Sequence, residues 1–182
     1  MEGHIEQEPR FKIELPAVGD EKALAPVHIQ AWKEAYIVPE SGLTEEKIDE
    51  LLAHLLTDTT YRRGTIERAL AEPEVVLYRV VKNVEGNIVG FLHGSKYEDY
   101  TELDAIYLLN EAKDSGTGSK LMGEFLSWSD RDKPCRLEVF SFNETAISFY
   151  NKFGFEITKS LPLYKNILPV SEMVRPVQEH HS

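Results

Sequence analysis

One segment, Leu103–Leu126, limits the possible folds more than any other part of the chain. It begins with the apolar run Ile106–Leu109, which has the length of a buried strand. A short turn containing Gly116 and Gly118 follows, and from Leu121 onward apolar residues recur at helical spacing. In such a strand–turn–helix unit the first helical amides have no backbone partner, and glycine leaves them open to a ligand. The segment therefore predicts an α/β fold with an anion-binding turn suited to phosphates.

Two common phosphate motifs do not fit this turn. A Walker loop needs Lys followed by Ser or Thr, but Leu121 follows Lys120, and this argues against a nucleotide hydrolase. A dinucleotide fingerprint needs a third glycine at position 121. The remaining pattern, Lys113-Asp114-Ser115-Gly116-Thr117-Gly118, resembles the [QR]-x-x-G-x-[GA] loop of the GCN5-related N-acetyltransferase (GNAT) family. That loop binds the pyrophosphate of acetyl-coenzyme A.

A second segment, Leu137–Phe155, resembles the downstream strand and helix of the same family. Asn143 is a good N-cap residue, and Gly154 suits the left-handed position that ends a helix. Asn143 and Tyr150 lie nearly two helical turns apart, so both side chains should project from one face, about 10 Å apart along the axis. The two side chains can therefore line one ligand.

The resemblance implies acetyl-coenzyme A as cosubstrate, and no metal. Main-chain groups of Ile106 and Leu108 would hold the pantetheine arm in a gap where their strand splays from the strand 136–140, and an amide near Leu108 would polarise the acetyl carbonyl. The turn would bind the pyrophosphate, and Asn143 would contact the pantetheine or acetyl region. The implied coenzyme-binding residues are Ile106, Tyr107, Leu108, Lys113, Asp114, Ser115, Gly116, Thr117, Gly118, Ser119 and Asn143.

Acyl transfer also needs an acid for the departing thiolate and a route for the proton of the amine. Tyr150 is the candidate acid, because a phenol with a pKa of about 10 stays protonated at neutral pH; simple packing beside Phe149 is the alternative. Glu138 is the candidate base, a role that the resemblance implies through a glutamate at this position in relatives that acetylate protein N-termini. A structural pair with Arg136 or simple exposure is the alternative for Glu138. Tyr107 and Asp104 are weaker candidates for the base.

The resemblance also implies an acceptor pocket shaped by Trp32 and Tyr36, although aromatic residues at that spacing can equally be core. Three residues depart from the family pattern. Lys113 replaces a glutamine or arginine, Asp114 puts a carboxylate next to the pyrophosphate, and Asn110 stands at a common proline position. A carboxylate there should weaken coenzyme binding unless it turns outward.

Composition limits the partners. The chain has 182 residues, of which 42% are hydrophobic, and this fits one domain with one good core. A net charge of −11 argues against nucleic acid or an anionic membrane as partner. The one cysteine permits no intrachain disulfide, and with no signal peptide or long apolar run we expect a cytoplasmic protein. Exposed final strands would allow a homodimer.

The pattern of elements predicts a mixed, mostly antiparallel sheet of six or seven strands with splayed central strands, flanked by helices. We expect a poorly ordered segment 1–10, a single acetyltransferase domain over 11–176 and a tail over 177–182. Thr44 should cap a helix whose apolar stripe, from Ile48 to Leu56, is core. The expected strands are 11–15, 75–84, 88–96, 102–109, 136–140, 157–164 and 167–174.

Together these observations lead to one main hypothesis. The chain would transfer an acetyl group from acetyl-coenzyme A to a primary amine, which attacks the thioester directly in a ternary complex. The acceptor would be a small amine, a polyamine or a peptide N-terminus. The alternative is a catalytically silent domain of the same fold that binds acyl-coenzyme A or a protein partner for regulation.

Overall fold

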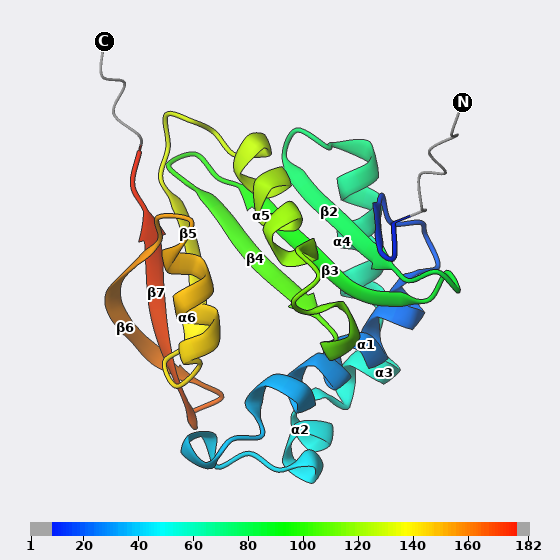
Figure 1. Cartoon of the computed structure of the whole chain (residues 1–182), viewed down its shortest axis with the longest axis vertical. Helices are drawn as coiled ribbons and strands as arrows, with labels where there is room; N and C mark the ends of the chain where they lie inside the picture. The colour runs from blue at the N-terminus through cyan, green and yellow to red at the C-terminus, as the bar shows by residue number, and fades with distance from the viewer. Residues whose placement is uncertain (1–8, 178–182) are drawn as a thin grey trace, which may run out of the picture.

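A computed structural model of the chain describes residues 9–177. The N-terminal residues 1–8 and the last residues, 178–182, lie outside the described residues, and most of the predicted disordered segment and tail lies with them. Figure 1 shows one sheet with helices on both faces.

The sheet has seven strands in the order β1-β2-β3-β4-β5-β7-β6. Every neighbouring pair is antiparallel except β4 and β5, which run parallel, so the predicted fold class is confirmed. The strands are β1 (Lys12–Glu14), β2 (Val76–Lys82), β3 (Ile88–Lys96), β4 (Thr101–Leu108), β5 (Cys135–Phe140), β6 (Glu156–Tyr164) and β7 (Leu168–Arg175).

Helices cover the sheet in two layers (Figure 1). The helices α5 (Thr117–Trp128) and α6 (Glu144–Asn151) pack on one face, over a core that includes Leu92, Leu121 and Phe155. The other face carries α1 (Glu21–Tyr36) and α4 (Thr60–Ala71). The remaining helices are α2 (Glu45–Leu52), α3 (His54–Thr57) and the short 3₁₀ turns η1 (Pro39–Ser41) and η2 (Asn110–Ala112).

Local capping sets several helix ends as the sequence predicts. The Asn143 side chain accepts a hydrogen bond from the Ala146 amide at 3.2 Å, and Gly154 follows the helix with φ 82°. Thr44 caps α2 in the same way, but the predicted long helix breaks after Leu52 into α2 and α3. Leu56 is consequently 58% exposed, so the predicted buried stripe is wrong at that end.

The central strands diverge, and this is the feature that creates the site. β4 pairs with β5 only from Thr101 to Leu103, opposite residues 135–137. Beyond Leu137, β5 stays paired with β7 alone, so the later part of β4 faces β5 without a hydrogen-bonded ladder. Figure 1 shows the two strands moving apart toward the end where α1 and α2 lie. The predicted splay of the central strands is therefore present.

On its other side, β4 remains tightly paired with β3. A Cβ atom added at Gly90 of β3 would lie 2.5 Å from Leu108 Cδ2 and 2.6 Å from the Tyr107 carbonyl oxygen. Glycine at this position lets β3 and β4 approach closely. Because β5 does not pair with β4 beyond Leu103, the diverging end of β4 is held by β3 alone.

Candidate active site

The turn between β4 and α5 forms an open helix N-terminus. Gly116 caps α5 with φ 82°, a left-handed conformation that favours glycine, and Asp114 also has a positive φ, 57°. The amides of Gly118 and Ser119 lie in the first turn of α5, where no intrahelical acceptor exists. These two donors and the positive end of the helix dipole suit an anion.

Side chains within the turn hold its shape. The Ser115 hydroxyl donates to the Ala112 carbonyl at 2.6 Å and accepts from the Thr117 amide at 3.3 Å. The Lys113 ammonium donates to Asn110 Oδ1 at 2.8 Å. Asp114 and Asn110 are exposed. The departures from the family pattern therefore stay at the surface of the turn.

Gly118 lies where three elements meet. A Cβ atom built on it would contact Leu108 Cδ1 of β4 at 3.5 Å and the Phe149 ring of α6 at 3.6 Å. Leu108 and Phe149 are both partly buried against the core under α5 and α6. The N-terminus of α5, the end of β4 and the helix α6 thus converge at the wide end of the gap.

An aromatic wall bridges the gap on the face that carries α1. The aromatic wall consists of Trp32 and Tyr36 of α1 together with Phe140 of β5. Trp32 Nε1 donates to the Tyr107 hydroxyl of β4 at 3.1 Å, and its ring centroid lies 5.3 Å from that of Phe140. Tyr36 contacts Phe140 edge to face at 4.9 Å. Trp32 and Tyr36 are only 4% and 8% exposed, so both residues assigned to the acceptor pocket are also core residues.

Three phenols, Tyr36, Tyr107 and Tyr150, interact within this region. Burial, followed by the influence of Tyr107 and Tyr150, raises the pKa of Tyr36, whereas the Asn143 side chain lowers it. Burial raises the pKa of Tyr107, and burial followed by the influence of Tyr107 raises the pKa of Tyr150 well above its ordinary value. All three phenols therefore stay protonated at neutral pH. Asn143 and Tyr150, predicted to share one face of α6, both interact with Tyr36.

Glu138 lies on β5 just after the last β4–β5 pair, and its side chain is exposed. The pair with Arg136 considered from the sequence is made by Glu172 instead, whose Oε2 lies 2.6 Å from Arg136 Nη2. On the neighbouring strand, burial raises the pKa of Glu102, and Asp104 adds to that effect. Glu138 therefore stands on an acidic part of the open sheet face.

A polar cluster that the sequence did not single out as a group lies between this acidic face and the aromatic wall. Ser95 donates to Asp104 Oδ2 at 2.7 Å, and His93 Nε2 lies 3.6 Å from the same oxygen. Tyr78 stacks on His93 at 5.5 Å and accepts a hydrogen bond from Arg62. The signal available in the sequence was two polar side chains, His93 and Ser95, at alternate positions of an otherwise apolar strand.

Arg62 extends this cluster to the aromatic wall. Its Nη2 lies 3.0 Å from His28 Nδ1, and the His28 ring packs 4.7 Å from that of Tyr107. Because a guanidinium can only donate, Nδ1 accepts and Nε2 carries the proton of the neutral ring. Burial, followed by the charge of Arg62, lowers the pKa of His28 to about 3, so the ring is neutral at physiological pH.

Residues 39–155 match the model of the Acetyltransferase (GNAT) family, a span that contains the turn, the gap and the capped helix α6. The chain belongs to the GNAT acetyltransferase family. It is therefore an acyltransferase, and the resemblance of its two motifs is confirmed. No protein of curated function matches the sequence significantly.

Solved structures with the GNAT fold resemble the chain over most of its length. The PaiA N-acetyltransferase of Thermoplasma acidophilum, in complex with coenzyme A, has a TM-score of 0.69 at 21% identity, covering 89% of this chain and 97% of that one. Naa20 of Chaetomium thermophilum, in complex with a bisubstrate analogue, has a TM-score of 0.66 at 17% identity, covering 91% and 86%. Ard1 of Thermoplasma volcanium has a TM-score of 0.57 at 26% identity, covering 93% and 99%.

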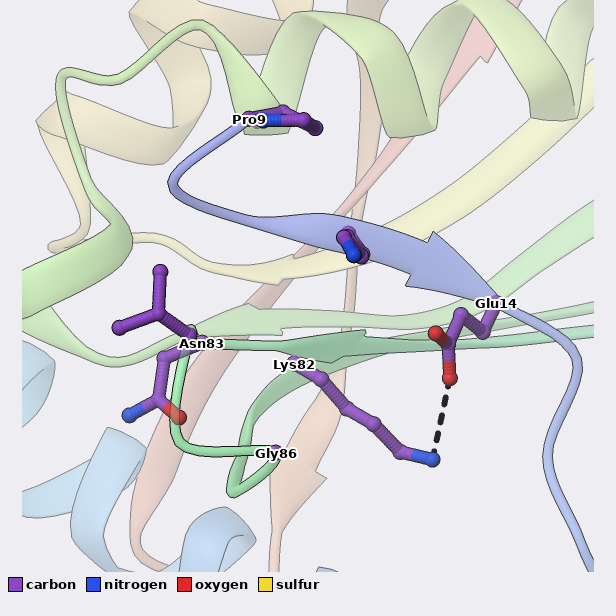
Figure 2. A pocket seen from close by; sticks show the side chains of 7 residues that line it. Pro9, Glu14, Lys82, Asn83 and Gly86 are labelled. Atoms are coloured by element: carbon purple, nitrogen blue, oxygen red, sulfur yellow. Dashed lines mark ion pairs between the residues drawn. The ribbon is translucent and has the colours of Figure 1, made fainter. Parts of the chain in front are cut away.

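The candidate active site is separate from a surface hollow at the β1 edge of the sheet. Figure 2 shows this hollow between β1 and the turn that joins β2 to β3, with Pro9, Asn83 and Gly86 around it. An ion pair of 3.0 Å between Glu14 and Lys82 crosses its edge. Because β1 and β2 line the hollow, β3 lies between it and β4.

Two further properties of this GNAT domain concern residues 9–177 alone. That part of the chain contains no helix long and apolar enough to cross a membrane. It also contains no group of three or more histidine, cysteine, aspartate or glutamate side chains placed to hold a metal ion.

Proposed function

We propose that the chain transfers an acetyl group from acetyl-coenzyme A to a primary amine, which attacks the thioester directly in a ternary complex. The observation that carries this proposal is the parting of β4 and β5 after Leu103 and Leu137, with an open helix N-terminus at the wide end of the gap. The similar structures of PaiA with coenzyme A and of Naa20 with a bisubstrate analogue support it.

The donor binds through the backbone. The diphosphate takes the amides of Gly118 and Ser119 at the N-terminus of α5, and the pantetheine arm follows the free edge of β4 along residues 106–108. An amide near Leu108 polarises the acetyl carbonyl. Lys113 adds positive charge at the surface of the turn, without the fork geometry of an arginine.

Tyr150 protonates the departing thiolate. Its hydroxyl lies among phenols whose burial keeps them protonated, so the group can donate at any physiological pH. Asn143, held at the N-terminus of α6 by its own capping hydrogen bond, positions Tyr36 at the same place and contacts the arm of the coenzyme.

The acceptor is a small amine or a peptide N-terminus. It approaches from the face that carries Glu138, because the coenzyme enters from the face of α5 and α6. An exposed carboxylate beside the gap attracts an ammonium group, and the family resemblance assigns the base to this residue. Trp32 and Tyr36 border the approach through the aromatic wall.

A thiol-release assay tests the proposal. Purified protein is mixed with acetyl-coenzyme A and polyamines, amino acids, aminoglycosides or short peptides, and free coenzyme A is measured. We expect release with at least one amine and a loss of about 10²-fold in kcat for Tyr150→Phe. Calorimetric binding of acetyl-coenzyme A without release for any amine would instead indicate a silent acyl-coenzyme A-binding domain.

A further inference from the structure

A β-bulge brings Asp104 next to His93 at the point where β4 leaves β5. His93 of β3 pairs with Ala105 of β4, but the next residue, Gly94, pairs with Leu103. Asp104 is therefore the extra residue of the bulge, and it also directly follows the last residue that pairs with β5. Bulges beside active sites commonly turn a side chain toward the chemistry. Here the turned side chain is a carboxylate facing an imidazole.

The contacts around His93 hold the ring from three strands. Asp104 Oδ2 lies 3.6 Å from His93 Nε2 and accepts a 2.7 Å hydrogen bond from the Ser95 hydroxyl, which itself lies 3.5 Å from Nε2. On the opposite side the ring stacks on Tyr78 of β2. The His93 and Asp104 side chains remain 12% and 25% exposed, so both stay accessible to a ligand from solvent.

On this face the two ends of the gap have different borders. The aromatic wall covers the gap at the level of Tyr107, through the contacts of Trp32 with Tyr107 and Phe140. Nearer the narrow end, the gap is bordered by Ala105, which is only partly buried, and by the exposed Glu138. Residues paired across antiparallel strands have Cβ atoms about 5 Å apart, so His93 stands one strand away from the free edge of β4 at Ala105.

The structure assigns to His93, supported by Asp104 and Ser95, the role of taking the proton from the acceptor ammonium group. This inference rests on the proposed function and differs from it in placing the base on β3 instead of at Glu138. His93 is then a catalytic residue, and Asp104 and Ser95 are positioning residues.

The charged groups around the ring are consistent with this role. Burial lowers the pKa of His93, Asp104 raises it and Arg62 of α4 lowers it again, and the net pKa lies below 6.5. Ser95 and Tyr78, the other polar groups that contact the ring, carry no charge at neutral pH. The ring is therefore neutral at physiological pH and can accept a proton, which a charged imidazolium could not do.

The proton balance of the step is complete. The bound ammonium group gives one proton to the neutral imidazole, and the resulting amine attacks the thioester carbonyl. The C–N bond forms, the C–S bond breaks, and the thiolate takes the proton of Tyr150. The acylated nitrogen loses its second proton to the phenolate of Tyr150 through solvent, and the imidazolium loses its proton to solvent.

A pair of probe amines separates this role from a structural one. Benzylamine is charged at neutral pH and must lose a proton before it attacks, whereas the isomeric 4-methylaniline is already neutral. We expect His93→Gln to lower kcat/KM for benzylamine about 10²-fold and to change that for 4-methylaniline much less. The matched control His54→Gln makes the same change at an exposed histidine of α3 and should leave both values unchanged.

The pH profile for benzylamine gives the second measurement. In the wild type, kcat/KM should fall as the pH drops through the pKa of His93, which lies below 6.5. Asp104→Asn should shift this acid limb of the profile to lower pH, because it removes the charge that raises the pKa of His93. This shift decides the question if His93→Gln does not fold. Equal losses for the two amines in His93→Gln, or an acid limb that disappears in Glu138→Gln, would overturn the assignment. A wild type that binds acetyl-coenzyme A but acetylates neither probe nor any amine of the panel refutes the proposed function itself, and the assignment with it.

Discussion

Replacing the two glycines of the β4–α5 turn by alanine should affect different properties: Gly116→Ala should lower stability, and Gly118→Ala should lower the affinity for the coenzyme. Gly116 has φ 82° and no atom within 4 Å of a built Cβ, so Gly116→Ala introduces backbone strain without a clash. That strain costs about 1–2 kcal/mol. The reduced entropy of the unfolded chain offsets about 0.4–1 kcal/mol of it. We expect the free energy of unfolding to fall by about 1 kcal/mol.

Gly118 lies within the first turn of α5, where the backbone is helical. Alanine there favours the helix by about 0.5–1 kcal/mol, and its Cβ would meet Leu108 and Phe149 at 3.5 and 3.6 Å, an ordinary contact distance. Gly118→Ala should therefore fold at least as well as the wild type. The methyl group, however, occupies the junction through which the coenzyme must pass to reach the first amides of α5.

Thermal unfolding and calorimetric titration with acetyl-coenzyme A measure the two effects separately. For a chain of this length, 1 kcal/mol shifts Tm by about 2–4 °C. We expect Gly116→Ala to lower Tm by about this amount, and Gly118→Ala to keep Tm while the affinity falls at least about tenfold, or about 1.4 kcal/mol. Wild-type affinity in a fully folded Gly118→Ala variant would refute the placement of the diphosphate at α5.

Three further predictions concern the phenols, the aromatic wall and the buried ion pair. For Tyr150→Phe, kcat should fall at every pH. Because the pKa of Tyr150 is raised, the pH profile of the wild type should show no basic limb from this group below pH 10. Full activity of Tyr150→Phe across the pH range would exclude Tyr150 as the acid. Trp32→Phe keeps a ring in the wall but removes the donor to Tyr107, so urea unfolding should show a loss of about 1 kcal/mol, and an unchanged free energy would show that the hydrogen bond contributes nothing. Burial would raise the pKa of Glu172, but the Thr158 hydroxyl and the Arg136 guanidinium bring it below 4.5. The contribution of the ionised carboxylate to the free energy of unfolding is therefore complete above pH 4.5, and it is lost as the pH falls through the lower pKa of the folded state. Glu172→Gln should thus reduce stability by about 1–3 kcal/mol at pH 7 and flatten the acid side of the stability curve, whereas parallel curves would contradict the assignment.

Much of this molecule follows from local sequence. The capped helix between Asn143 and Gly154 and the turn around Gly116 use hydrogen bonds and backbone conformations that neighbouring residues decide among themselves. The strands also follow from runs of apolar or alternating residues, so the order of elements and the fold class could be predicted. The break of the helix after Leu52 could not, because no glycine or proline marks it.

The site, in contrast, depends on which strands pair with which. The gap exists because β5 remains paired with β7 after it leaves β4, a choice of partner that the sequence of β5 alone does not specify. The hydrogen bond between Trp32 and Tyr107 joins residues 75 positions apart. The contact of His93 with Asp104 requires a one-residue bulge, and such a shift changes the face on which a side chain lies. Local propensities therefore determined the elements, whereas long-range pairing and register decided where the reacting groups meet.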